Sequence, residues 1–169
     1  CAEIIRQVRF NREMKRRLLS VIPHGYIDRE PALSSWAEIA QQVKQHPKVL
    51  GVAPYIASEA LVSYAGGVQP IQIEGVLPEE EMKISVINNH MLLGSLADLK
   101  AGEFGVVMGS MMAQQLGLAM GDKVVITSSD INITPAGIFP RNKNFTLIGV
   151  FEVGNEVDNS LAIIHLQDA

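Results

Sequence analysis

The stretch that decides the fold is KVVITSSDINITPAGIFPRNKNFTLIGVFEV, residues 123–153. Its two ends, Lys123–Thr127 and Asn144–Phe151, show the alternation of apolar and polar residues that is typical of half-buried strands. Residues 128–143 lie between them, whereas a tight hairpin needs a loop of only about two to five residues. A longer excursion in a compact domain is usually functional or disordered. The pattern therefore predicts two strands that are joined by a long polar excursion.

Two prolines stiffen the middle of this excursion. Pro135 and Pro140 fix φ, and the glycine between them predicts a turn. Ile138 and Phe139 would then be exposed next to the cation of Arg141, and a stiff apolar tip of this kind loses little entropy on docking. The tip is therefore a candidate protein-binding element. The alternative is a variable surface loop whose apolar residues fold back on the domain.

Charge is distributed unevenly along the chain of 169 residues, of which 47% are hydrophobic. Because the whole chain carries −4 and residues 1–17 carry +4, the remainder carries −8. The basic leading segment suits nucleic acid or anionic lipid, but the acidic body argues against a nucleic-acid-binding domain. The hydrophobic content is sufficient for one core or two small ones.

The only cysteine is Cys1, so no internal disulfide can form. Cys1-Ala2 suggests the start of a processed lipoprotein, but an amphipathic pattern follows at once where a polar tether is expected, so a cut site fits better. No signal peptide is present, and no apolar run approaches the roughly 18 residues of a membrane-spanning helix. We therefore expect a soluble domain that belongs to a larger protein.

Periodicity predicts an α+β fold. Residues 3–20 have the pattern of an amphipathic helix, which either packs on its own domain or continues from a membrane span. The other expected helices are Trp36–Gln45 and Met111–Leu116, the latter capped by Ser110 and ended by Gly117. The remaining expected strands are Gly25–Asp28, Val49–Ala53, Tyr55–Tyr64, Gln69–Val76, Gly105–Met108 and Ser160–Leu166, with a turn at Gly66-Gly67. The early strands are expected to form a small layer that one helix covers.

No catalytic or cofactor-binding constellation emerges from the sequence. The histidines are scattered and none pairs with a cysteine or carboxylate at metal-ligand spacing; they are His24, His46, His90 and His165. Ser110 does not lie in a nucleophile elbow, and no phosphate loop is present. We predict a non-catalytic binding or coupling domain without a metal or cofactor. The alternative, a small hydrolase, lacks a pair of nucleophile and base.

Several motifs resemble the extracytoplasmic domain of MacB-type ABC transporter permeases: Gly105-Val-Val-Met-Gly109, Leu116-Gly-Leu118, Gly121-Asp-Lys-Val124 and Ile148-Gly-Val-Phe151. Others narrow the resemblance to the lipoprotein-releasing permeases LolC and LolE of Gram-negative bacteria. The LolE-like motifs are Arg17-Leu-Leu-Ser-Val-Ile-Pro-His-Gly25, Trp36, Ala53-Pro-Tyr-Ile56, Ile71-Gln-Ile-Glu-Gly-Val76 and Val157-Asp-Asn-Ser160. Thr134-Pro-Ala-Gly-Ile-Phe-Pro-Arg141 instead resembles the protruding hook loop of LolC. The subtype, LolC, LolE or a combined homodimeric form, stays open.

The resemblance implies a MacB-like domain of two parts. Residues 1–71 and 154–169 would form a porter-like α+β half that is truncated at its C-terminal end, and residues 72–153 an inserted β-rich, Sabre-like half. Residues 130–143 would be the hook-like loop. Its partner-binding residues would be Pro135, Ala136, Gly137, Ile138, Phe139, Pro140 and Arg141.

The resemblance also implies a function. The domain would stand in the periplasm, on an inner-membrane permease that extracts lipoproteins and passes them to a LolA-like carrier for delivery to the outer membrane. The implied partners are this carrier or the lipoprotein itself. In the full complex they also include a partner permease subunit and a LolD-like ATPase, which would hydrolyse ATP. The alternative within the family is a MacB-like efflux permease that binds an adaptor protein.

Overall fold

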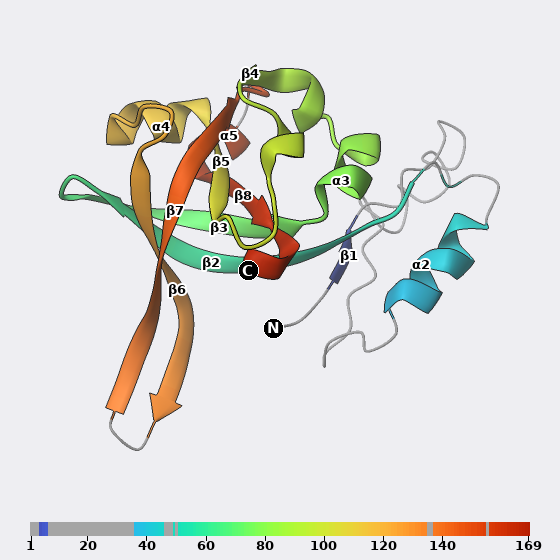
Figure 1. Cartoon of the computed structure of the whole chain (residues 1–169), viewed down its shortest axis with the longest axis horizontal. Helices are drawn as coiled ribbons and strands as arrows, with labels where there is room; N and C mark the ends of the chain where they lie inside the picture. Colours follow the sequence, from blue (N-terminus) through green and yellow to red (C-terminus); the bar gives the residue numbers. More distant parts are fainter. Residues whose placement is uncertain (1–3, 7–35, 46–48, 50, 135–136, 155) are drawn as a thin grey trace.

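The computed structural model describes residues 4–6, 36–45, 49, 51–134, 137–154 and 156–169. Its strands form one mixed sheet with the order β1-β2-β3-β8-β5-β7-β4, and β6 pairs with both β2 and β7 (Figure 1). The strands are β1 (Ile4–Arg6), β2 (Ala53–Tyr64), β3 (Gly67–Val76), β4 (Met91–Leu93), β5 (Gly105–Gly109), β6 (Lys123–Thr134), β7 (Gly137–Phe151) and β8 (Leu161–His165). The mixture of helix and sheet agrees with the predicted α+β class.

The pairing of β6 with two strands closes a ring through β2, β3, β8, β5, β7 and β6. The ring mixes antiparallel pairs with two parallel ones, β3 with β8 and β5 with β7. The early strands β2 and β3 pair with each other as expected, but they belong to this larger ring and not to a small layer of their own. The outer edge of β2 pairs with β6, and the outer edge of β3 pairs with β8.

The turn residues of the β2–β3 hairpin set the register in which β2 and β3 pair. Tyr64 pairs with Gly67, which leaves the two-residue turn Ala65-Gly66. Both turn residues have positive φ, 47° and 87°, the combination found in tight turns that match the twist of the flanking strands. The turn expected at Gly66-Gly67 is thus present one residue earlier.

The main core lies inside the ring and beneath α4 (Ser110–Leu116). It consists of small and medium apolar side chains, which are Ala60, Val62, Ile71, Val106, Met108, Met112, Ala113, Val124, Ile126, Phe145, Leu147, Val150, Ala162 and Ile164. Gly117 ends α4 with φ 68°, as predicted. The predicted cap at Ser110 is wrong, since Ser110 is the first helical residue and Gly109 is the cap. A Cβ on Gly109 would stand 2.2 Å from the carbonyl oxygen of Asp158, so no side chain fits there.

A second core lies on the other side of β5 and β8, beneath short helices. These are α3 (Pro78–Ile84), the 3-10 helices Ile87–His90 and Leu96–Asp98, and α5 (Val157–Ser160). The buried carboxylate of Asp158 accepts hydrogen bonds from the N–H groups of Val153 and Gly154, at 2.8 and 2.7 Å. Asp158 thereby ties the chain after β7 to the helix that precedes β8.

Near the N-terminus the structure changes one prediction and confirms another. Residues 4–6, expected in a helix over 3–20, form β1, because pairing with Ala53–Tyr55 satisfies their backbone groups. Residues 7–20 of that predicted helix lie outside the described residues, and so does the strand expected at Gly25–Asp28. The predicted helix Trp36–Gln45 is confirmed as α2 (Trp36–Lys44).

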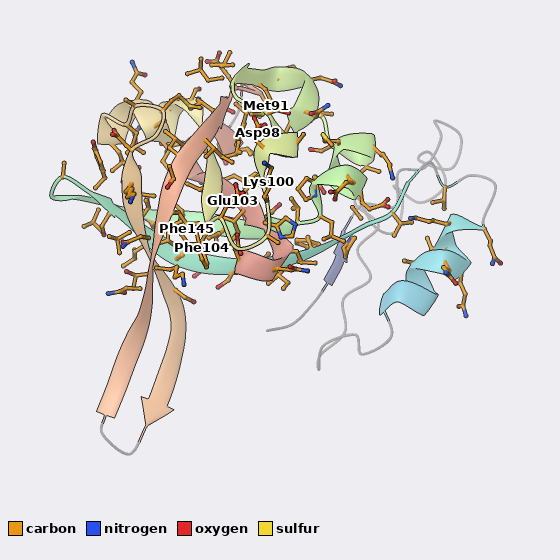
Figure 2. The ribbon with its side chains drawn as sticks, in the orientation of Figure 1. Met91, Asp98, Lys100, Glu103, Phe104 and Phe145 are labelled. Atoms are coloured by element: carbon orange, nitrogen blue, oxygen red, sulfur yellow. The ribbon has the colours of Figure 1, made fainter. Side chains whose placement is uncertain are left out.

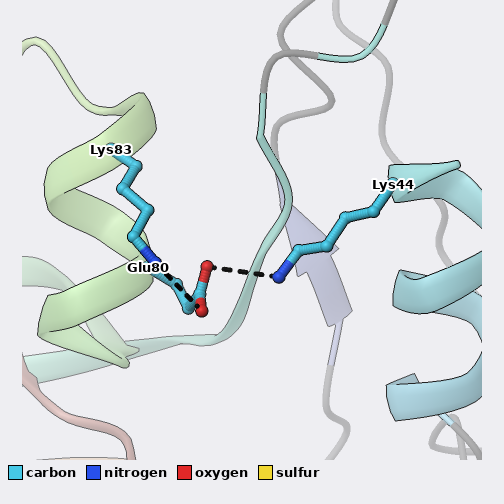
Figure 3. Close-up of polar contacts among 3 residues, drawn as sticks. All are labelled: Lys44, Glu80 and Lys83. Carbon is cyan, nitrogen blue, oxygen red and sulfur yellow. Dashed lines mark hydrogen bonds and ion pairs between the residues drawn. The ribbon is translucent and has the colours of Figure 1, made fainter. Parts of the chain in front are cut away.

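One carboxylate connects α2 to α3. Glu80 is 3.3 Å from the ammonium group of Lys44 and 3.3 Å from that of Lys83 (Figure 3). Burial acts to raise the pKa of Glu80, but the hydrogen bonds of the two lysines outweigh it and hold the pKa below its ordinary value. Within the described part of the chain, no helix combines the length and apolarity that crossing a membrane requires.

Candidate partner-binding arm

The predicted excursion is itself mostly strand. β6 continues to Thr134 and β7 begins at Gly137, so the prediction that the strands end at Thr127 and begin at Asn144 is wrong. Pairing continues because each extended strand satisfies the backbone groups of the other, and the β-branched residues of 131–134 suit a strand. Pro140 cannot donate to the ladder, but it is tolerated here because this part of β7 has no second neighbour among the strands that the structure describes.

The hairpin has two halves with different surroundings. In the inner half, β6 pairs with β2 as far as Ser128, and β7 pairs with β5 from Thr146 onward. In the outer half, pairing among the described strands is between β6 and β7 alone, from Ile131 opposite Pro140 to Thr134 opposite Gly137. We call residues 129–141 the arm. Figure 1 shows this two-stranded ribbon projecting well beyond the body.

A register shift separates the two halves. Thr127 pairs with Asn142, but the next pair is Ile131 with Pro140, so three residues of β6 stand opposite one of β7. Irregularities of this type bend a strand pair and increase its twist. The register shift therefore marks the point where the arm departs from the regular ladder of the inner half.

A polar cluster supports the start of β6. The carboxylate of Asp122 accepts hydrogen bonds from the Tyr64 hydroxyl, at 2.7 Å, and from the Ala119 N–H, at 2.9 Å. The bond from Ala119, followed by that from Tyr64, lowers the pKa of Asp122, while the hydrogen bond to Asp122 raises the pKa of Tyr64. The backbone of Leu147 pairs with Gly121 and Asp122, so β7 is fixed at the same place.

An aromatic contact supports β7 where it leaves the body. The rings of Phe104 and Phe145 meet edge to face, with centroids 5.8 Å apart, and the Lys143 ammonium lies 3.9 Å from the Phe104 centroid. Figure 2 shows the two rings close together at the root of the ribbon. Edge-to-face pairs and cation–π contacts are both favourable arrangements. Phe104 thus contacts β7 at Phe145 and Lys143, close to the point where the arm begins.

Phe104 has an unusual backbone conformation. Its φ is 52°, which costs a bulky residue on the order of 1–2 kcal/mol. The side chain of Asp168, in the 3-10 helix Leu166–Asp168, accepts hydrogen bonds from the N–H of Gly102 at 2.7 Å and of Phe104 at 3.2 Å. Its two oxygens hold the loop in this shape, so the last residues of the chain fix the residue that supports the arm.

The predicted site residues fall in or beside the arm. The backbone of Gly137–Pro140 lies opposite Ile131–Thr134, and Arg141 follows in β7. Pro135 and Ala136, which connect the two strands, lie outside the described residues. The role of all seven in partner binding stays a prediction. Sequence reasoning missed Tyr64, Phe104 and Asp168, whose partners are distant in the sequence and which belong to no motif.

A cavity of about 680 Å³ opens beside the root of the arm. Its walls are mainly apolar and include Ile73, Phe104, Ile126 and Phe145, with Lys143 among the polar residues. Within the described ranges, no group of three or more histidine, cysteine or acidic side chains could hold a metal ion. The root of the arm therefore combines an apolar cavity with a projecting ribbon, and both are features that a binding partner could contact.

The chain is similar to known proteins over most of its length. The family model described as the MacB-like periplasmic core domain matches residues 4–169. The chain is 39% identical over 164 residues to the "Lipoprotein-releasing system transmembrane protein LolC" of Neisseria meningitidis, and 37% identical over 161 residues to the LolC protein of Xylella fastidiosa. A protein named LolE from Haemophilus influenzae is 27% identical over 165 residues.

These alignments cover 95%, 94% and 95% of this chain but 39% of each relative, so the chain spans about two fifths of the length of the proteins it matches. The match to the family model runs from the start of β1 to the last residue and includes the whole hairpin. The chain belongs to the family of MacB-like periplasmic core domains.

Proposed function

We propose that this chain is the periplasmic domain of the permease subunit of an ABC transporter that extracts lipoproteins from the inner membrane. The permease would pass them to a periplasmic carrier for delivery to the outer membrane. The similarity to proteins named as lipoprotein-releasing transmembrane proteins supports this proposal over an efflux permease. ATP hydrolysis would belong to a separate, LolD-like subunit, and a second permease subunit would complete the complex.

The observation that carries the proposal is the arm. A ribbon that projects beyond its sheet can reach a partner that does not touch the body. Strand edges of this type bind other chains through main-chain hydrogen bonds. We propose that residues 135–141 of the arm bind the LolA-like carrier, with Arg141 as a donor to carboxylates or carbonyls on its surface.

The two-part organisation expected from the sequence belongs to the same proposal. Residues 72–153 would be the inserted half that carries the arm, and residues 1–71 with 154–169 the half that connects to the membrane segments. The domain would therefore stand on the periplasmic side of the inner membrane. In this arrangement the arm would point toward a carrier in the periplasm.

The proposal is tested by measuring the affinity of this chain for a purified LolA-like carrier by calorimetry. Arg141→Glu, or replacement of 135–140 by a glycine-serine linker, should abolish binding. Lys100→Glu, an equal charge reversal at an exposed position outside the arm, should preserve binding. Absence of binding by the wild-type chain would reject the carrier-binding role of the arm.

The efflux alternative predicts a different partner. A pull-down that offers both a LolA-like carrier and an efflux adaptor protein separates the two possibilities, because each permease type should retain only its own partner. Retention of the adaptor and not the carrier would overturn the proposed function.

A further inference from the structure

We propose that Phe104 and Asp168 are positioning residues for the arm: Asp168 locks the loop of Phe104, and Phe104 sets the direction in which the arm leaves the body. This inference deepens the proposed function, on which its binding readout rests. It follows from three contacts of Phe104. One joins it to Asp168 in the 3-10 helix Leu166–Asp168, and two join it to Phe145 and Lys143 at the root of the ribbon.

The first step is mechanical. A two-stranded ribbon is weakly held by its own ladder, so its direction depends on contacts at its root. On the β6 side, pairing with β2 provides that contact as far as Ser128. On the β7 side, pairing with β5 begins only at Thr146, and the residues just beyond it meet Phe104. Phe104 therefore contacts β7 between the end of its pairing with β5 and the beginning of the arm.

The second step concerns the shape of Phe104. A non-glycine residue with φ 52° keeps this conformation only where its surroundings impose it. Three hydrogen bonds surround the residue: its N–H and that of Gly102 donate to Asp168, and its carbonyl accepts from the Thr146 N–H at 2.9 Å. Backbone strain held in place by a distant carboxylate indicates a local geometry that serves a purpose.

The third step is the arrangement of the ring. Its edge-to-face contact with Phe145 lies on the core side, and Lys143 covers its face. Lys143 and Phe145 are two residues apart in β7, so one aromatic ring contacts the same side of the strand twice. A ring held at two points resists both bending and rotation of the ribbon.

The direction of the arm can be measured without any partner. In a Cys1→Ser background, spin labels at Asn132 in the arm and Gln114 on the exposed face of α4 report one distance by pulsed electron resonance. We expect a narrow distribution for the parent chain and a broadened or shifted one for Phe104→Ala and Asp168→Ala. Phe104→Tyr, which keeps the ring, should restore the narrow distribution, and Asp98→Asn, which removes a charge from an exposed site, should leave it unchanged.

The same variants predict a change in affinity for the LolA-like carrier. If the binding-competent direction falls to about a tenth of the population, the apparent Kd rises about tenfold. An unchanged distance distribution in both alanine variants, with each variant folded by circular dichroism, overturns this inference even where the carrier binds. Absence of carrier binding by the wild-type chain rejects the carrier-binding role of the arm instead, and the distance measurement still decides the positioning role.

Discussion

The inner and outer halves of the β6–β7 hairpin belong to the same two strands but are stabilised differently. In the inner half, Val124, Ile126, Phe145 and Leu147 are buried in the main core, and β2 and β5 extend the sheet on both sides. In the outer half, β6 and β7 pair only with each other among the described strands. The comparison teaches that one hairpin can be both part of a core and a projecting element, because pairing with a third described strand stops before the arm begins.

The largest expected effect comes from removing the aromatic anchor of the inner half. Phe145→Ala should lower the free energy of unfolding by about 3–5 kcal/mol, because the side chain is 3% exposed within the closed ring. Urea denaturation measures this change. Phe139→Ala in the arm is the matched substitution, and we expect it to cost less than about 1 kcal/mol. Equal costs at the two positions would contradict the division into halves.

Gly94→Ala tests how closely the body packs on β7. Gly94 has φ 68°, and a Cβ there would stand 2.1 Å from the carbonyl oxygen of Ile148. We expect a loss of stability of at least about 1–2 kcal/mol from the backbone conformation alone, with a further loss from the displaced strand. Thermal unfolding measures it. Gly102→Ala is the control, because Gly102 also has positive φ but open space around its Cβ, so the difference between the variants isolates the packing.

Acid should weaken the polar support at the start of β6. Because the pKa of Asp122 is lowered, its contribution to stability is present above its ordinary value of 3.8 and is lost as pH falls through the lowered pKa. The raised pKa of Tyr64 has the opposite consequence: its contribution is present below 10.0 and disappears as pH rises through the raised pKa. Denaturation across pH should therefore show a stability difference between wild type and Tyr64→Phe at neutral pH that shrinks at both extremes.

The smallest effect is expected at the boundary between the halves. Lys143→Ala removes the cation over Phe104 from an exposed position, which should cost about 0.5–1 kcal/mol. A double-mutant cycle with Phe104→Leu separates this contact from the general effect of the charge. A coupling energy near zero would show that the ring supports β7 through Phe145 alone.

Local signals predicted the inner half of the hairpin well and the outer half poorly. Alternation over Lys123–Thr127 and Asn144–Phe151 was sufficient there, because one face of each strand is buried. In the outer half, Pro135, Gly137 and Pro140 indicated a loop, whereas backbone pairing carries the strands through Pro140. The prolines and glycine that form the turn of a long ribbon are the same residue types that form a long loop, so the sequence alone does not distinguish the two.

The contacts that support the arm could not be predicted from the sequence. Asp168 and Phe104 are 64 residues apart, and the Tyr64 and Asp122 side chains are 58 apart. Such pairs depend on the closure of the ring, which no local pattern encodes. The helix cap at Gly109 was missed for a related reason, since the group that excludes a side chain there is the backbone of Asp158.

The register shift between Thr127 and Ile131 has a consequence for how the arm can change. Three residues of β6 face one of β7, so β6 carries two extra residues, an even number. Side chains alternate with a period of two, so an even surplus turns the ribbon without exchanging its faces, whereas a single insertion or deletion would exchange them. Re-aiming this element while keeping the same residues on each face therefore requires length changes in steps of two.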